Sequence, residues 1–221
     1  MFEPNFLALP APQRALWPEL AATPSAFALY GGTAIALRLG HRISVDFDFF
    51  SSSPFAPTAL MDNIPYLAGG VIRQSAANTL TVGVERGGPV QVSFFGGLSF
   101  GQVEPHETAN GSQIEVASLL DLAGMKVAVV TQRAELKDYL DIHALLTQGG
   151  IPLGVMLSAA SIIYGESFNP LIALKAVSYH DDPALDALPE AMRRDLIAAV
   201  RSVDPAALPK LDAVRARRPQ P

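Results

Sequence analysis

Residues 31–50 read GGTAIALRLGHRISVDFDFF, and this stretch places two carboxylates within a largely apolar run. Its first half predicts a helix that Gly40 ends, since glycine commonly follows the last turn of a helix. Residues 45–50 show the alternation of a strand. Because residues i and i+2 of a strand face the same side of a sheet, Asp46 and Asp48 are expected to project together, away from the apolar residues beside them.

Two interpretations of this acid pair follow. It is either the solvated face of a half-exposed strand or a metal site, because neighbouring carboxylates repel each other unless a cation lies between them. Mg²⁺ commonly takes one or two carboxylates together with substrate phosphates. The preceding residues favour the metal site. A short apolar strand at 27–30 leads into Gly31 and Gly32, and a helix start of this kind lets the backbone approach a phosphate closely.

A second segment carries further charged residues. Residues 118–146 read SLLDLAGMKVAVVTQRAELKDYLDIHALL, in which one lysine, Lys126, is followed by a K-D-x-x-D element. Together with residues 31–50, this segment resembles the AbiEii/AbiGii toxin family of the nucleotidyltransferase superfamily. The resemblance covers about residues 26–53 and 114–180, with β-rich sequence between them. It implies an α+β fold, in which a nucleotidyltransferase-like mixed β-sheet with flanking helices is followed by a helical C-terminal part.

The resemblance also implies a nucleotide site. A nucleoside triphosphate would lie on the glycine turn, with Mg²⁺ (or Mn²⁺) between its phosphates and the acid pair. Lys126 would contact phosphate, Asp138 would orient Lys126 or the acceptor, and Arg42 would steer the triphosphate unless it is simply solvated. The metal ligands and catalytic residues so implied are Asp46 and Asp48, with Lys126 and Asp138 as further catalytic residues. The nucleotide-binding residues so implied are Gly31, Gly32, Thr33, Arg42 and Lys126.

Helical geometry gives Lys126 an unusual position. It falls on an apolar face, where a lysine either extends its stem to water or meets an anion such as a phosphate. Asp121 lies about 140° away around the same helix and is not a natural partner. On the next helix Asp138 and Asp141 share a face, and Asp138 is expected to point inward. Asp141 can instead pair with Lys137 at the surface.

The pattern departs from the superfamily at one position. Nucleotidyltransferases of this kind usually have a third carboxylate on a neighbouring strand, and the matching residue here is Ser93 in the strand 90–95. Serine carries no charge, so it is a poor replacement for a carboxylate ligand, and its hydroxyl is a weak base near neutral pH. Glu85, across the hairpin predicted at Gly87 and Gly88, or Asp138 can substitute for it in space.

The function that the resemblance implies is Mg²⁺-dependent transfer of a nucleotide from a nucleoside triphosphate to an RNA acceptor, such as tRNA, or to a protein. Characterised members are toxins of toxin–antitoxin or phage-defence pairs, so a cognate antitoxin is an expected partner. Ser93 favours an alternative, a decayed transferase that binds nucleotide or a partner without turnover. A purely structural role in a two-protein complex is a third hypothesis. The nucleotide, the acceptor and the oligomeric state stay open.

Composition narrows the class of protein. The chain has 221 residues, of which 49% are hydrophobic, and a formal net charge of −5. This charge excludes a general nucleic-acid coat protein, so any RNA contact must be a local patch. The lack of cysteine excludes disulfides and thiolate metal sites, and the scattered histidines give no zinc spacing. The start carries no basic cluster and no apolar run is long enough to span a membrane, so a cytoplasmic protein is expected.

The predicted elements divide the chain into a nucleotidyltransferase-like core, residues 1–115, and a helical domain, residues 116–221. The core is expected to hold helical segments at 11–22, 33–39 and 56–63 and strands at 27–30, 45–50, 70–75, 78–85 and 90–95. The second domain is expected to hold helices at 118–132, 135–148, 153–164, 170–179 and 190–202. A loose tail that includes residues 215–219 is expected to follow.

Overall fold

The computed structural model describes residues 1–212 and residue 214, so the expected tail at 215–219 lies outside the described residues. Contacts within the chain group it into two units. The first unit is Met1–Ser99 with His106–Ala117, and the second is Phe100–Pro105 with Ser118–Pro221. Residues 100–105 therefore belong with the second unit, although both neighbouring segments belong to the first.

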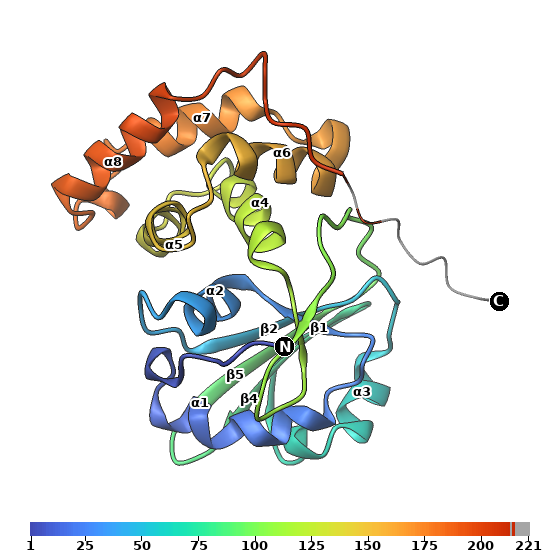
Figure 1. The fold of residues 1–221 in the computed structure, drawn as a ribbon. Coiled ribbons are helices and arrows are strands. Elements are labelled where there is room, and N and C mark those ends of the chain that lie inside the picture. The colour runs from blue at the N-terminus through green and yellow to red at the C-terminus, as the bar shows by residue number, and fades with distance from the viewer. Residues whose placement is uncertain (213, 215–221) are drawn as a thin grey trace. The chain divides into compact units, whose positions relative to one another are not determined.

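The first unit is built on a mixed β-sheet, which agrees with the α+β class expected from the sequence. Within the described residues the sheet has seven strands in the order β3-β4-β5-β2-β1-β7-β6 (Figure 1). The strands are β1 Ala28–Tyr30, β2 Asp46–Phe50, β3 Val71–Ala76, β4 Thr79–Glu85, β5 Pro89–Phe95, β6 Glu107–Thr108 and β7 Glu115–Val116. β2 runs parallel to β5 and β1 parallel to β7, while the other neighbours are antiparallel.

The strand alternation of β2 builds the core of this unit. Phe47 and Phe49 are fully buried, whereas the residues between them are partly exposed. Trp17 packs on Phe47 with ring centroids 6.3 Å apart, and Phe94 stacks on Phe49 at 5.4 Å. Helices α1 (Ala11–Leu16) and α3 (Pro57–Asn63) lie along one face of the sheet (Figure 1). Apolar burial thus fixes which face of β2 points inward.

The β4–β5 hairpin predicted from the glycines is confirmed. The two strands pair from Thr79 with Phe95 to Glu85 with Pro89. Gly87 and Gly88 form the turn with φ angles of +74° and +155°, which side-chain-bearing residues rarely adopt. Strands β6 and β7 were not predicted, because two-residue strands are too short to show a period in the sequence.

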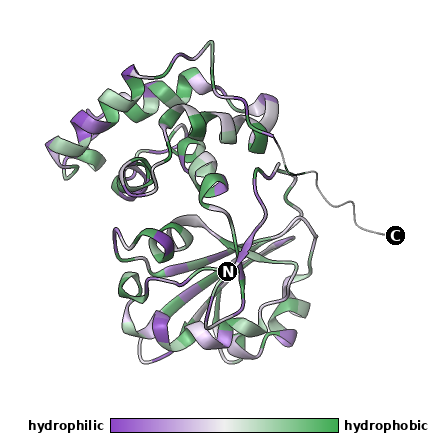
Figure 2. Ribbon diagram, viewed as in Figure 1, coloured by the Kyte–Doolittle hydropathy of each residue, from purple (hydrophilic) through white to green (hydrophobic). Residues whose placement is uncertain are grey.

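The second unit is helical in the described residues. Its helices are α4 Leu119–Val129, α5 Leu136–Thr147, α6 Leu153–Tyr164, α7 Pro170–Ser178 and α8 Glu190–Arg201. Ser118 and Asn169 cap α4 and α7 through their side chains, which accept from the backbone N–H groups of Asp121 and Leu171. In Figure 2, α8 alternates between hydrophilic and hydrophobic colours, and of its residues only Leu196 is fully buried. None of the helices in the described part of the chain is long and apolar enough to cross a membrane.

The segment 100–105 is tied to the second unit by the carboxylate of Asp121. The backbone N–H groups of Val103 and Glu104 donate to its two oxygens at 2.7 and 3.0 Å. Ser118 Oγ donates to the same carboxylate at 2.5 Å. A buried acid with three donors is well satisfied, so Asp121 acts as the anchor of this segment.

Candidate active site

The acid pair lies on one face of β2, as the alternation predicted. Asp46 and Asp48 are both partly exposed, and the phenylalanines next to them in the strand are buried on the other face. Asp48 is paired with Tyr30 of β1 on one side and with Ser93 of β5 on the other. The two carboxylates therefore sit near the middle of the sheet.

The glycine turn follows β1 directly and lies against the second acid. Helix α2 (Gly31–Leu39) begins at the residue after Tyr30, and Gly31 has a φ of +75°. A Cβ atom on Gly31 would lie 3.0 Å from Asp48 Oδ2, so a larger residue would crowd the carboxylate and strain the backbone. Only glycine allows the start of α2 to approach Asp48 this closely.

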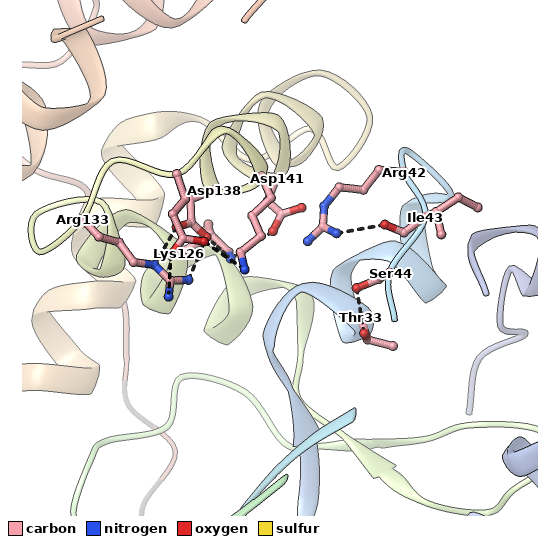
Figure 3. Close-up of polar contacts among 10 residues, drawn as sticks. Thr33, Arg42, Ile43, Ser44, Lys126, Arg133, Asp138 and Asp141 are labelled. Carbon is pink, nitrogen blue, oxygen red and sulfur yellow. Dashed lines mark hydrogen bonds and ion pairs between the residues drawn. The ribbon is translucent and has the colours of Figure 1, made fainter. Parts of the chain in front are cut away.

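The side chain of Thr33 is buried and forms hydrogen bonds within the first unit. It is 2% exposed, and its hydroxyl is hydrogen-bonded to Ser44 Oγ at 2.8 Å (Figure 3). The same hydroxyl donates to the carbonyl oxygen of Asp46. Thr33 thus joins α2 to the beginning of β2. Among the described residues no side chain caps the start of α2, so its first N–H groups are the donors that an anion would meet.

Arg42 lies in the loop before β2 and is partly exposed. Its guanidinium donates to the carbonyl oxygen of Ile43 at 3.1 Å (Figure 3). This contact places the cation on the segment that leads into the acid pair. A contact between Arg42 and a triphosphate stays a prediction.

The position of the expected third carboxylate is occupied by a buried hydroxyl. Ser93 is 3% exposed, and Thr81 Oγ1 donates to its Oγ at 3.3 Å. The proposal that Glu85 replaces the missing acid is wrong, because Glu85 lies four residues further along β4 than Thr81, the partner of Ser93. That separation is about 13 Å along a strand.

In the second unit Lys126 meets anions from its own chain. Its Nζ atom lies 2.8 Å from Asp138 Oδ1 and 2.9 Å from Asp141 Oδ2 (Figure 3). Lys126 is 8% exposed and both aspartates are fully buried. The alternative pairing of Asp141 with Lys137 is wrong, since Lys137 pairs with Glu135 at 2.9 Å. The shared face of Asp138 and Asp141 points toward the lysine on α4 and away from solvent.

Arg133 extends this cluster to the surface, since its side chain is 46% exposed. Its Nε donates to Asp138 Oδ2 at 3.0 Å, so the two oxygens of Asp138 are held by two different cations. Arg133 also pairs with Glu135 at 3.2 Å, whereas Lys126, Asp138 and Asp141 form the buried part of the cluster. Removing one member of such a cluster leaves a buried charge without compensation, which makes it costly to disturb.

Comparison with known proteins identifies the family. The family model described as nucleotidyl transferase AbiEii toxin, type IV toxin–antitoxin system, matches residues 15–217. The chain belongs to the AbiEii family. The resemblance drawn from residues 31–50 and 118–146 is thereby confirmed.

Three individual proteins are similar to this chain in sequence or in fold. An uncharacterised protein of Aquifex aeolicus (strain VF5) is 30% identical over 158 residues, which are 71% of this chain and 74% of the relative. The fold is similar to that of MenT4, a nucleotidyltransferase toxin of Mycobacterium tuberculosis H37Rv, with a TM-score of 0.57, 16% identity and coverage of 87% and 82% of the two chains. The fold is also similar to that of an H. pylori protein described as a nucleotidyltransferase. The TM-score is 0.53, the identity is 17%, and the coverage of the two chains is 86% and 90%.

The acid pair of this AbiEii protein fits a divalent cation that shares its ligands with a substrate. Within the described residues no three acidic or histidine side chains gather in one place, so Asp46 and Asp48 are the protein ligands available in the first unit. Two carboxylates fill part of the octahedral shell of Mg²⁺ and leave positions for phosphate oxygens and water. The donor set suits a metal that arrives with nucleotide.

The structure brings the expected residues of this AbiEii protein together in two separate groups. Gly31, Thr33, Asp46 and Asp48 gather in the first unit, and Lys126 and Asp138 gather in the second. Sequence reasoning placed Asp141 on the face of Asp138 but offered it a partner at the surface, and the structure pairs it with Lys126. It missed Ser44, which carried no signal in the sequence.

Proposed function

We propose that this protein is a Mg²⁺-dependent nucleotidyltransferase toxin that transfers a nucleotide from a nucleoside triphosphate to an RNA acceptor. The observation that supports it best is the closeness of Gly31 to Asp48, since a Cβ atom on Gly31 would lie 3.0 Å from Asp48 Oδ2. A phosphate on the first N–H groups of α2 would lie beside the acid pair, so phosphate and metal ligands adjoin.

The proposed reaction is an in-line displacement. An acceptor hydroxyl oxygen bonds to the α-phosphorus, the bond from that phosphorus to the bridging oxygen breaks, and pyrophosphate leaves. Asp46 and Asp48 would hold Mg²⁺, which would neutralise phosphate charge when bound. The helix start binds the leaving phosphates, Arg42 steers the triphosphate, and Asp46 receives the hydroxyl proton.

Lys126 retains capacity for a phosphate. An ammonium group has three donors, and Asp138 and Asp141 use two of them. We assign the third to an anion such as a phosphate and assign Asp138 the role of holding the amine in position. On this proposal the first unit is the transferase core, the second is a helical domain, and the toxin acts in the cytoplasm opposite a cognate antitoxin.

A second candidate function rests on Ser93. With a hydroxyl where the third carboxylate is usual, the protein would bind nucleotide without transferring it. The two candidates differ in turnover and share the nucleotide site.

The deciding experiment incubates the full chain with each labelled nucleoside triphosphate, Mg²⁺ and total RNA. Label in the RNA fraction is expected from wild type and is expected to disappear in Asp46→Asn/Asp48→Asn. Nucleotide binding without any labelled product would establish the second candidate. Transfer that continues unchanged in the double variant would show that the acids are only a solvated strand face.

A further inference from the structure

Tyr30 connects the acid pair to the glycine turn. It pairs with Asp48 across β1 and β2 and is followed directly by Gly31, the first residue of α2. Because paired residues face the same side of a sheet, the ring of Tyr30 lies on the face that carries Asp48. Tyr30 is only 3% exposed, so the contacts that hold its side chain also hold the start of the helix.

The side chain of Tyr30 is held at its ring and at its hydroxyl. The ring stacks on Phe50 with centroids 5.0 Å apart and an angle of 15° between the planes. The hydroxyl is hydrogen-bonded to His106 Nε2 at 3.0 Å, and the imidazole ring of His106 stands edge-on to the tyrosine ring at 5.7 Å. A tyrosine held in both ways keeps one rotamer, and its backbone is fixed with it.

His106 belongs to a short segment that also holds the other end of α2. The next residue, Glu107, pairs with Val116 in the sheet and accepts a hydrogen bond from Arg38 at 3.2 Å. Arg38 lies in the last turn of α2, and its guanidinium also donates to the carbonyl oxygen of Ala117 at 2.8 Å. Two successive residues therefore engage the residue before α2 and the last turn of α2.

The position of α2 matters because a helix start binds phosphate well only when its N–H groups are already in place. In the part of the chain that the structure describes, no side chain caps α2, so the direction of these N–H groups depends on the contacts around the helix. Gly31 lies so close to Asp48 that a small rotation of α2 would change the spacing between the phosphate donors and the proposed metal ligand. Pre-organisation lowers the free-energy cost of ordering a site when its ligand binds.

We infer that His106 is a positioning residue for the triphosphate. It acts through the hydroxyl of Tyr30, which holds Gly31 and the first N–H groups of α2 in place beside Asp48. Glu107 assists by holding the last turn of the same helix. The inference rests on the proposed function, from which it takes the nucleotide site, and adds residues that lie outside both of the charged sequence segments.

The test measures the affinity of the full chain for the Mg²⁺ complexes of ATP, CTP, GTP and UTP by isothermal titration calorimetry. Tyr30→Phe removes only the hydroxyl, and it is expected to weaken binding of the triphosphate that wild type prefers by about threefold to tenfold. His106→Ala is expected to do the same, and the double variant should bind no more weakly than His106→Ala, because both changes remove one hydrogen bond. His106→Gln, whose amide can still pair with the hydroxyl, should keep most of the affinity.

Tyr66→Phe is the matched control in the same unit. The Tyr66 hydroxyl is hydrogen-bonded to Thr23 Oγ1 at 2.7 Å, and Tyr66 is 2% exposed, so this variant also loses a hydroxyl contact of a buried tyrosine. The melting temperature of every variant is measured beside its affinity. Tyr66→Phe is expected to lower the melting temperature about as much as Tyr30→Phe does and to leave the triphosphate affinity unchanged.

The possible results separate this inference from the proposed function. Equal triphosphate affinity of wild type and Tyr30→Phe overturns the inference, even in a protein that transfers nucleotide. A lower melting temperature of His106→Ala without loss of affinity overturns it too, since a contact that only stabilises the fold gives that result. Weaker binding by Tyr30→Phe in a protein that transfers nothing supports the inference and contradicts the proposed function. A wild type that binds none of the four triphosphates overturns the inference together with the nucleotide site.

Discussion

Asp48 of β2 and Ser93 of β5 are direct partners in a parallel ladder, so the second acid of the pair lies beside a residue that carries only a hydroxyl. Ser93 is buried and hydrogen-bonded to Thr81. Catalytic competence of this chain therefore depends on whether two carboxylates on one strand suffice.

Replacing Ser93 with aspartate tests that question directly. A third carboxylate beside Asp48 is expected to lower the melting temperature without metal, because like charges repel in a buried place, and Mg²⁺ with triphosphate should restore most of the loss. Ser93→Asn is the control, because asparagine has the same shape as aspartate but adds no charge. The melting temperature of each variant is measured with and without Mg²⁺ and triphosphate. An equal rise in melting temperature for Ser93→Asp and Ser93→Asn would contradict this prediction.

Lys126→Ala is expected to damage folding and nucleotide binding together. The buried pairs with Asp138 and Asp141 make the expected loss of unfolding free energy about 3–5 kcal/mol. Lys126→Met/Asp141→Asn should recover much of that stability while triphosphate binding stays lost. Chemical denaturation and nucleotide titration of both variants separate the two effects. Normal binding by the stable double variant would remove Lys126 from the nucleotide site.

Gly124→Ala is expected to destabilise the helical unit although alanine favours helices. A Cβ atom on Gly124 would lie 2.8 Å from the backbone nitrogen of Ala160, so α4 and α6 would have to separate, at a cost of about 1–3 kcal/mol. Gly154→Ala is the matched control in α6, where the nearest atom would be 3.5 Å away. It should be neutral or slightly stabilising in a urea melt. Similar effects from both variants would refute close backbone packing at Gly124.

Stability is expected to fall as the pH drops below about 6.5, the ordinary pKa of histidine. Burial lowers the pKa of His180, whose ring donates to the carbonyl oxygen of Val177 at 2.9 Å. The folded protein therefore keeps His180 neutral while the unfolded chain takes up a proton, so this contribution is present above the unfolded pKa and is lost as the pH falls through the folded one. His180→Gln, which keeps a donor, should flatten the acid side of a plot of unfolding free energy against pH. His143→Gln is the control, and an unchanged slope in the His180 variant would contradict the assignment.

Local patterns predicted much of this protein. The alternation in residues 45–50 was enough to place Asp46 and Asp48 on one face, because strand geometry depends only on neighbours. The resemblance matched Ser93 to the third carboxylate on a neighbouring strand, and the structure pairs this residue directly with Asp48. In contrast, the partners of Lys126 depend on how α4 meets α5, which no local period reveals. The same holds for the bulge between Ile72 and Gln74 in β3, because the irregularity arises from pairing with another strand.

The place of the short segment 100–105 in the chain constrains the order in which the two units can fold. The polypeptide passes between the two units after Ser99, after Pro105 and after Ala117. During synthesis the sheet cannot be completed until β7 emerges, and by then the segment that Asp121 anchors has already been made. Neither unit is a continuous piece of polypeptide. A cut after Ser99 divides the first unit, a cut after Ala117 divides the second, and a cut after Pro105 divides both. Folding of the two units is thereby coupled by connectivity alone, and we expect them to unfold in one cooperative transition.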